Sequence, residues 1–144
     1  MSSMAVVLAG GDGESPPWPA GLPVRVLIVD DNDLIRDAAA DLMAARAGFE
    51  VVGQAASGEA AVRLARLLEP DLVLMDFVLP GLSGAEATGQ IVRHDPAVRV
   101  IMLLPTSDRD YQRAANFAGA VAGVAKDRLD EDLLPTIANV VTGA

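Results

Sequence analysis

The feature that most constrains the fold is a repeated alternation of short apolar runs with longer segments of helical periodicity. From Val24 onward, the short runs are VRVLIV, FEVVG, DLVLM, VRVIMLL and VAGVA. The segments between and after them space their apolar residues as amphipathic helices do, which predicts helices over residues 33–46, 57–69, 84–94, 107–118 and 129–141. Strict alternation of strand and helix predicts a parallel sheet covered on both faces, with right-handed crossovers. The sequence therefore predicts a doubly wound α/β fold.

Residues at the predicted helix ends agree with this assignment. Ser57 and Ser107 are predicted N-caps, because a serine hydroxyl accepts a hydrogen bond from a backbone N–H of the first turn. Gly48 and Gly119 stand where a left-handed residue commonly ends a helix. Pro70 stops the helix before it.

The first 22 residues have a different character. The stretch LAGGDGESPPWPAGLP is dense in Gly, Pro and Ser and has no apolar period. Such a segment cannot bury enough apolar surface to offset the entropy of ordering it. We therefore expect a disordered tail over residues 1–22 and one domain over residues 23–144, a size at which a single core buries most of its apolar surface.

Charge and composition exclude several classes of function. The chain has 20 acidic and 11 basic residues, for a net charge of −9, and no basic stripe, so we expect no nucleic-acid binding by this domain alone. Cysteine is absent, which excludes disulfides and thiolate metal sites. No apolar run reaches the ~18 residues of a membrane span, and no basic region precedes an apolar N-terminal run. A cytoplasmic location without membrane association is the expectation.

Charged residues follow three of the predicted strands. Asp30 and Asp31 follow the first, Asp76 ends the third, and Lys126, the only lysine in the sequence, follows the fifth. Ligands of open parallel sheets bind at the carboxyl ends of the strands, near the point where strand order reverses. We therefore expect these side chains to converge on one edge of the sheet.

The chemistry of such an edge is specific. Two carboxylates about 4 Å apart repel by ~4 kcal/mol at an effective dielectric constant near 20. A hard divalent cation relieves that repulsion, and oxygen ligands suit Mg²⁺. With a lysine as a second positive charge, the group is suited to phosphoryl transfer, and Asp76, which lies between the others in strand order, is the expected nucleophile. The expected product is an aspartyl phosphate.

Three motifs together resemble the receiver domain of two-component response regulators. They are VLIVDDNDLIRD, PDLVLMDFVLPGLSG and GVAKD, and with the final DEDLLPTI they are most similar to the nitrate-regulator branch. The resemblance extends from residue 24 to about residue 141. It implies a flavodoxin-like, five-stranded sheet of order 2-1-3-4-5 with five helices. Members of that branch usually carry a helix-turn-helix output domain; the sequence does not separate a stand-alone receiver from a part of a longer regulator.

The resemblance also implies a role for each site residue. Asp30 and Asp31 would hold Mg²⁺ together with Asp76, and Val78 would supply a backbone carbonyl to the metal. Asp76 would accept a phosphoryl group from a sensor histidine kinase, and Lys126 would bind the phosphoryl oxygens. The domain would not be an enzyme in the usual sense but a phosphoacceptor that assists its own phosphorylation and dephosphorylation.

Two positions depart from the family pattern. Leu104 stands where the pattern has Ser or Thr, and Gly123 stands where it has an aromatic residue. Leucine cannot hydrogen-bond a phosphoryl group, and glycine has no ring to move. Thr106 is the alternative hydroxyl if the loop after the fourth strand bulges. The phosphorylation chemistry is predicted to be intact and the switch that relays it to be weakened.

Two other functions stay open on the sequence. One is a pseudo-receiver, which keeps the acids but acts as a protein-interaction module without phosphorylation. The other is a Mg²⁺-dependent phosphatase or nucleotide-binding α/β enzyme, against which the sequence has no Gly-rich phosphate loop after the first strand. For partners, we expect a homodimer or an effector protein on the face formed by residues 107–141, with Tyr111, Phe117 and Leu129 contributing.

Overall fold

The computed structural model describes residues 23–142, so the predicted tail over residues 1–22 lies outside the described residues. The elements are, in order, β1 (Val24–Val29), α2 (Asp33–Ala44), β2 (Phe49–Ala55), α3 (Gly58–Leu68), β3 (Leu72–Asp76), α4 (Gly84–His94), β4 (Arg99–Leu104), α5 (Arg109–Ala118), β5 (Ala122–Ala125), a short 3₁₀ helix η1 (Lys126–Arg128) and α6 (Leu129–Thr142). The predicted alternation of strands and helices is confirmed. Within residues 23–142, every helix falls short of the length and hydrophobicity that a bilayer crossing requires.

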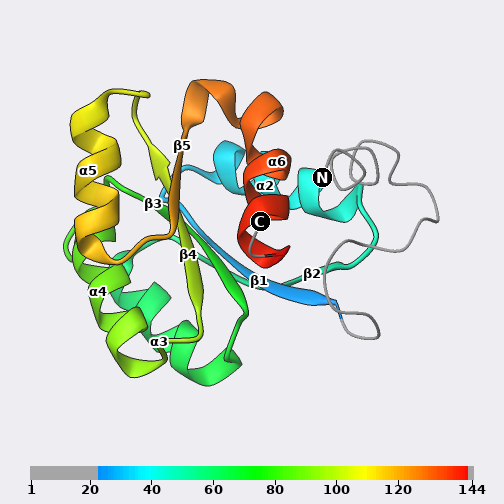
Figure 1. The fold of residues 1–144 in the computed structure, drawn as a ribbon. Helices are drawn as coiled ribbons and strands as arrows, with labels where there is room; N and C mark the ends of the chain where they lie inside the picture. Colours follow the sequence, from blue (N-terminus) through cyan, green and yellow to red (C-terminus); the bar gives the residue numbers. More distant parts are fainter. Residues whose placement is uncertain (1–22, 143–144) are drawn as a thin grey trace.

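The strands form one parallel sheet of order β2-β1-β3-β4-β5. Helices α2 and α6 cover one face, and α3, α4 and α5 cover the other (Figure 1). This is the predicted flavodoxin-like arrangement. The chain runs from β1 outward to β2 and then returns to β3 on the other side of β1, so strand order reverses between β1 and β3. Their carboxyl ends therefore flank the usual ligand position of such a sheet.

Two hydrophobic cores lie on the two faces of the sheet, because successive strand side chains point to opposite sides. In β3, Leu72 and Leu74 pack in the core under α2 and α6, whereas Val73 and Met75 pack under α3, α4 and α5. All four side chains are fully buried. Burial of each side chain of this size stabilises the fold by roughly 1.5–3 kcal/mol. The packed central strands therefore hold the site residues at their carboxyl ends in fixed positions.

The helix ends match the prediction in part. Ser57 is the N-cap of α3, and its side chain accepts a hydrogen bond from the Ala60 N–H at 3.1 Å. Ser107, however, is not an N-cap: α5 is capped by Asp108, which accepts from the Asp110 N–H at 2.8 Å. Asp108, one position after Ser107, is the N-cap because its own N–H donates to the Thr106 hydroxyl in the turn that precedes the helix.

Leu129 also differs from the prediction. It is only 6% exposed and belongs to the core under α2 and α6, so it cannot contribute to a docking face. The reason is the spacing along α6: Leu129, Leu133 and Ile137 recur every four residues and form one buried stripe.

Candidate functional site

The predicted site residues meet at the carboxyl ends of the strands. Val29 of β1 pairs with Met75 of β3, which places Asp30 and Asp76 side by side where the two strands end. Lys126 follows β5, and its side chain reaches back to both acids. The convergence expected from the sequence is therefore present in the structure.

The three acids form a compact cluster. Asp30, Asp31 and Asp76 each offer a carboxylate oxygen, and these oxygens all lie within 4.8 Å of one another. Asp30 and Asp76 are buried, whereas Asp31 is exposed. At such a separation, two carboxylates repel by ~3–4 kcal/mol at an effective dielectric constant near 20. The cluster thus has an unfavourable concentration of negative charge that a cation relieves.

Lys126 compensates part of this charge. Its Nζ lies 2.8 Å from Asp30 Oδ2 and 3.0 Å from Asp76 Oδ1. Burial lowers the pKa of Lys126, but the hydrogen bonds and charges of both aspartates outweigh it and raise the pKa above its usual value. A single ammonium beside three carboxylates leaves a net deficit of positive charge. The remaining imbalance favours a divalent cation.

The two oxygens of Asp76 have different surroundings. Oδ1 accepts a hydrogen bond from the Val78 N–H at 3.1 Å and lies against Lys126. Oδ2 is buried and has no hydrogen-bond partner among residues 23–142. Burial, aided by the charge of Asp30 and opposed by Lys126, raises the pKa of Asp76 to about 6. At neutral pH, Oδ2 is therefore an ionised, unpartnered oxygen, and the donor set as a whole fits Mg²⁺.

Glycines shape the loop that follows Asp76. A Cβ at Gly84 would lie 1.9 Å from the Asp76 carbonyl oxygen, so only glycine allows α4 to begin so close to β3. Gly81 has φ +70°, in the left-handed region that glycine favours. Val78, the residue expected to lend a carbonyl to the metal, lies in the exposed part of this loop.

Arg36 is a site neighbour that the sequence reasoning did not identify. Its Nη1 donates to the Asp30 carbonyl oxygen at 2.6 Å, and its Nη2 pairs with Asp33. Asp33 belongs to the first turn of α2, as expected of a helix N-terminal acid. The i,i+3 spacing of Asp33 and Arg36 predicts their ion pair, but it does not predict the contact of Arg36 with the Asp30 carbonyl. Arg36 thereby ties the start of α2 to the residue that ends β1.

The switch positions are filled by apolar packing. Leu104 is fully buried at the end of β4, and its side chain packs against Gly123, which pairs with Met102 across the β4–β5 ladder. Thr106 is exposed, and its hydroxyl accepts from the Asp108 N–H at 3.1 Å. Thr106 thus lies in a local turn, and within residues 23–142 its hydroxyl makes no hydrogen bond to Asp30, Asp31 or Asp76.

The face over residues 107–141 carries two exposed apolar side chains. Phe117 is 96% exposed and Val121 is 51% exposed. Tyr111 is half-buried and packs edge-on against Phe77, with ring centroids 5.2 Å apart. Phe77 directly follows Asp76, so this aromatic contact joins the acceptor loop to α5.

Comparison with known proteins identifies relatives over most of the chain. A family model described as the response regulator receiver domain matches residues 26–138. The response regulator GacA from Pseudomonas aeruginosa is 37% identical over 120 residues, which make up 83% of this chain and 56% of that protein. The chain thus spans little more than half the length of this relative.

Solved structures give the same result. A LuxR-family two-component response regulator from Aurantimonas sp. SI85-9A1 matches with a TM-score of 0.79 and 34% identity, over 84% of this chain and 86% of that chain. The receiver domain of the histidine kinase CKI1 from Arabidopsis thaliana, complexed with Mg²⁺ and BeF₃⁻, matches with a TM-score of 0.68 and 25% identity, over 81% of this chain and 88% of that chain. With its sheet order, its acid–lysine site and these matches, the chain belongs to the response regulator receiver domain family of two-component systems.

Proposed function

We propose that this domain accepts a phosphoryl group on Asp76 from a sensor histidine kinase in the cytoplasm. The observation that carries the proposal is the contrast between the two oxygens of Asp76: Oδ1 is held by Val78 and Lys126, and Oδ2 is buried without a partner in the described part of the chain. A fixed and unpartnered carboxylate oxygen is suited to attack phosphorus, because positioning supplies much of the catalysis of phosphoryl transfer.

The transfer balances as a simple displacement. Asp76 Oδ2 attacks the phosphorus of a phosphohistidine, an O–P bond forms, the N–P bond breaks, and the leaving imidazole nitrogen keeps the electron pair and takes a proton from solvent. Lys126 neutralises charge beside the acceptor and turns towards the phosphoryl oxygens. Mg²⁺ would be held by Asp30, Asp31, Asp76 and the Val78 carbonyl, and when bound it supplies neutralisation of the charge on the transferred group.

A second candidate function is a pseudo-receiver that acts through protein contacts alone. The observation that favours it is the pair Leu104 and Gly123, which offers neither a hydroxyl for a phosphoryl oxygen nor a ring to move. In either case, the exposed Phe117 and Val121 mark the face over residues 107–141 for a second copy or an effector protein.

Incubation with acetyl phosphate and Mg²⁺ tests the proposal. Intact mass should rise by one phosphoryl group, the adduct should be labile to base, and Asp76→Asn should not form it. Lys126→Ala should fold and give a lower yield. Absence of the adduct with acetyl phosphate and with a phosphorylated kinase would favour the pseudo-receiver.

A further inference from the structure

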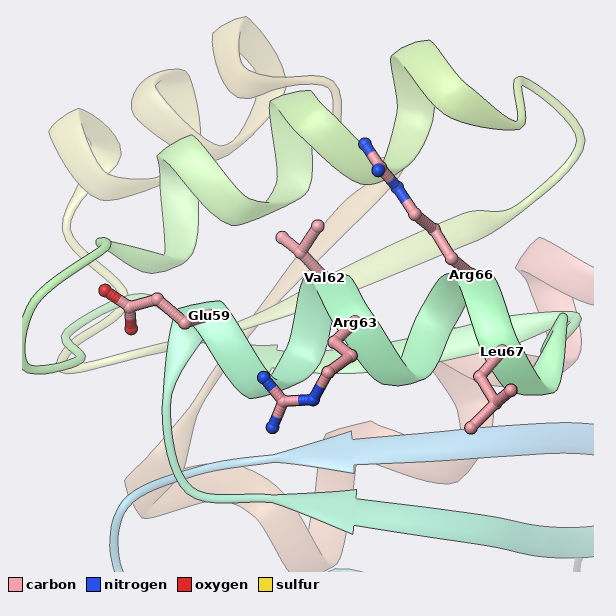
Figure 2. A pocket seen from close by; sticks show the side chains of 5 residues that line it. All are labelled: Glu59, Val62, Arg63, Arg66 and Leu67. Atoms are coloured by element: carbon pink, nitrogen blue, oxygen red, sulfur yellow. The ribbon is translucent and has the colours of Figure 1, made fainter.

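Glu59, in the first turn of α3, lies beside the loop that follows Asp76. Figure 2 shows its carboxylate directed away from α3 towards the loop before α4, at one end of the open hollow lined by Glu59, Val62, Arg63, Arg66 and Leu67. Glu59 Oε2 accepts a hydrogen bond from the Leu82 N–H at 3.1 Å. This contact joins residues that are 23 positions apart in the sequence.

The backbones at this contact are unusually close. A Cβ added at Gly58 would lie 2.2 Å from the Leu82 carbonyl oxygen, so α3 begins directly against the loop. A Cβ added at Gly81 would lie 2.8 Å from Glu59 Oε2. Glycines at 58 and 81 thus make room for the carboxylate to reach the Leu82 N–H. Residues of both α3 and the loop after β3 therefore allow this contact, which is not a chance approach of a surface side chain.

Backbone hydrogen bonds anchor the start of the loop that follows Asp76. At its start, the Phe77 N–H donates to the Leu103 carbonyl at 2.9 Å, and the Val78 N–H donates to Asp76 at 3.1 Å. In the middle, Val78 and Pro80 are exposed, whereas Leu79 between them is buried in the core under α3, α4 and α5.

Two glutamates from different helices hold the end of the loop. Glu59 of α3 takes the Leu82 N–H, and Glu86 of α4 takes the Ser83 N–H at 3.1 Å. The Glu86 contact closes the capping box of α4 and is local to that helix. The Glu59 contact comes from another strand–helix unit, so it fixes the loop relative to the sheet.

We propose that Glu59 is a positioning residue for the phosphoacceptor site. By fixing the far end of the loop, it restricts the backbone around Val78, and through it the geometry of the Asp76 carboxylate and of the Mg²⁺ ligands. This inference rests on the proposed function, since it concerns how well the same site is preorganised. Loss of one hydrogen bond of this kind should weaken Mg²⁺ binding about two- to tenfold.

Three substitutions at this position separate its roles. Glu59→Ala removes the acceptor, Glu59→Asp keeps the charge but shortens the reach, and Glu59→Gln keeps the reach and an acceptor oxygen without the charge. Glu50→Ala, which removes an exposed acid from β2, is the matched control for the loss of charge. Thermal melts establish that each variant is folded before binding is compared.

The readouts are the exchange protection of the Leu82 amide, the Mg²⁺ dissociation constant by calorimetry, and the rate of acetyl phosphate labelling below Mg²⁺ saturation. Glu59→Ala and Glu59→Asp should lose protection at Leu82, weaken Mg²⁺ binding about two- to tenfold and label more slowly. Glu59→Gln and Glu50→Ala should stay close to wild type. Wild-type Mg²⁺ affinity in a Glu59→Ala protein that has lost protection at Leu82 would overturn the inference. Failure of wild type itself to bind Mg²⁺ or accept phosphate would instead count against the proposed function.

Discussion

Leu104 occupies the space that a side chain at position 123 would need. A Cβ added at Gly123 would lie 2.7 Å from Leu104 Cδ1 and 2.9 Å from Gln112 Oε1. Gln112 also donates to the Gly123 carbonyl at 3.4 Å, which closes the same space from the side of α5. The two departures from the family pattern are therefore coupled by packing: the large side chain of Leu104 on β4 fits because position 123 on β5 is glycine.

This complementarity predicts a coupled effect on stability. Gly123→Ala alone should lower the free energy of unfolding by about 1–3 kcal/mol, because the new methyl group overlaps a fully buried leucine. In a Leu104→Thr background, which lacks the Cδ atoms, Gly123→Ala should lower the free energy of unfolding by clearly less. Urea denaturation of the four proteins of this cycle measures the coupling. If the changes in the free energy of unfolding of the two single variants add up to that of the double variant, Leu104 and Gly123 are independent.

Most of the fold could be predicted from the sequence, because its signals are local. The alternation of apolar runs and amphipathic segments places each strand and helix, and parallel strands bring their carboxyl ends to one edge. For this reason Asp30, Asp76 and Lys126 could be expected to converge although they come from three separate units.

The features that could not be predicted are contacts made by long side chains and the choice of one residue over its neighbour. The contacts of Arg36 with the Asp30 carbonyl and of Glu59 with the Leu82 N–H depend on packing that no local pattern encodes. Neighbouring Ser107 and Asp108 are both good capping residues, and the turn that decides between them is not visible in the sequence. Leu129 is different: its four-residue spacing along α6 was a signal that it is buried.

Binding of Mg²⁺ should stabilise the domain by mass action. At a Mg²⁺ concentration ten times the dissociation constant, the gain should be about 1.4 kcal/mol, seen as a higher melting temperature than in EDTA. Asp31→Ala should abolish the gain, because it removes one of three clustered carboxylates. Asp37→Ala is the control, since Asp37 is an exposed acid of α2 that lies outside the cluster. Equal melting temperatures of wild type in Mg²⁺ and EDTA would contradict an assembled site.

The buried charge of Asp76 should make the Mg²⁺-free protein less stable as pH rises. Burial raises its pKa from 3.8 to about 6, so between these values the folded state binds the proton more tightly than the unfolded state. The carboxyl group therefore adds no penalty below pH 3.8, and above about pH 6 its penalty is complete, on the order of 3 kcal/mol.

Asp76→Asn should remove this penalty. In EDTA above pH 7, the variant should be more stable than wild type by about 1–3 kcal/mol, and the difference should shrink as pH falls from 6 towards 4. Urea denaturation at several pH values measures it. Asp37→Asn, which removes an exposed carboxylate of α2 outside the site, serves as the control. A destabilised Asp76→Asn protein at pH 7 would mean that Lys126 overcompensates the buried charge.

The response to phosphorylation should be weak. A phosphoryl group shifts a two-state equilibrium only by its differential interaction with the two states. A hydroxyl that bonds a phosphoryl oxygen supplies ~1.5–3 kcal/mol, enough to change a population ratio by roughly ten- to a hundredfold or more. Leu104 supplies no such bond, and its Cδ1 methyl group lies only 2.7 Å from where the Cβ of a side chain at position 123 would stand. Thr106 is exposed and held in its own turn.

We therefore expect partner affinity and oligomeric state to change by less than about threefold on phosphorylation, or with beryllofluoride in its place. Leu104→Thr combined with Gly123→Tyr should enlarge the response, because the first change supplies the hydroxyl and removes the Cδ atoms that a side chain at 123 would meet. Gln112 must also turn aside, which a flexible side-chain end can do at low cost. Leu104→Thr alone is the control, with a hydroxyl but no ring. Sedimentation at several concentrations, with and without beryllofluoride, measures the shift. A large shift in the native protein would mean that another contact carries the signal, and the Phe77–Tyr111 contact between the acceptor loop and α5 would be the first to test by Tyr111→Ala.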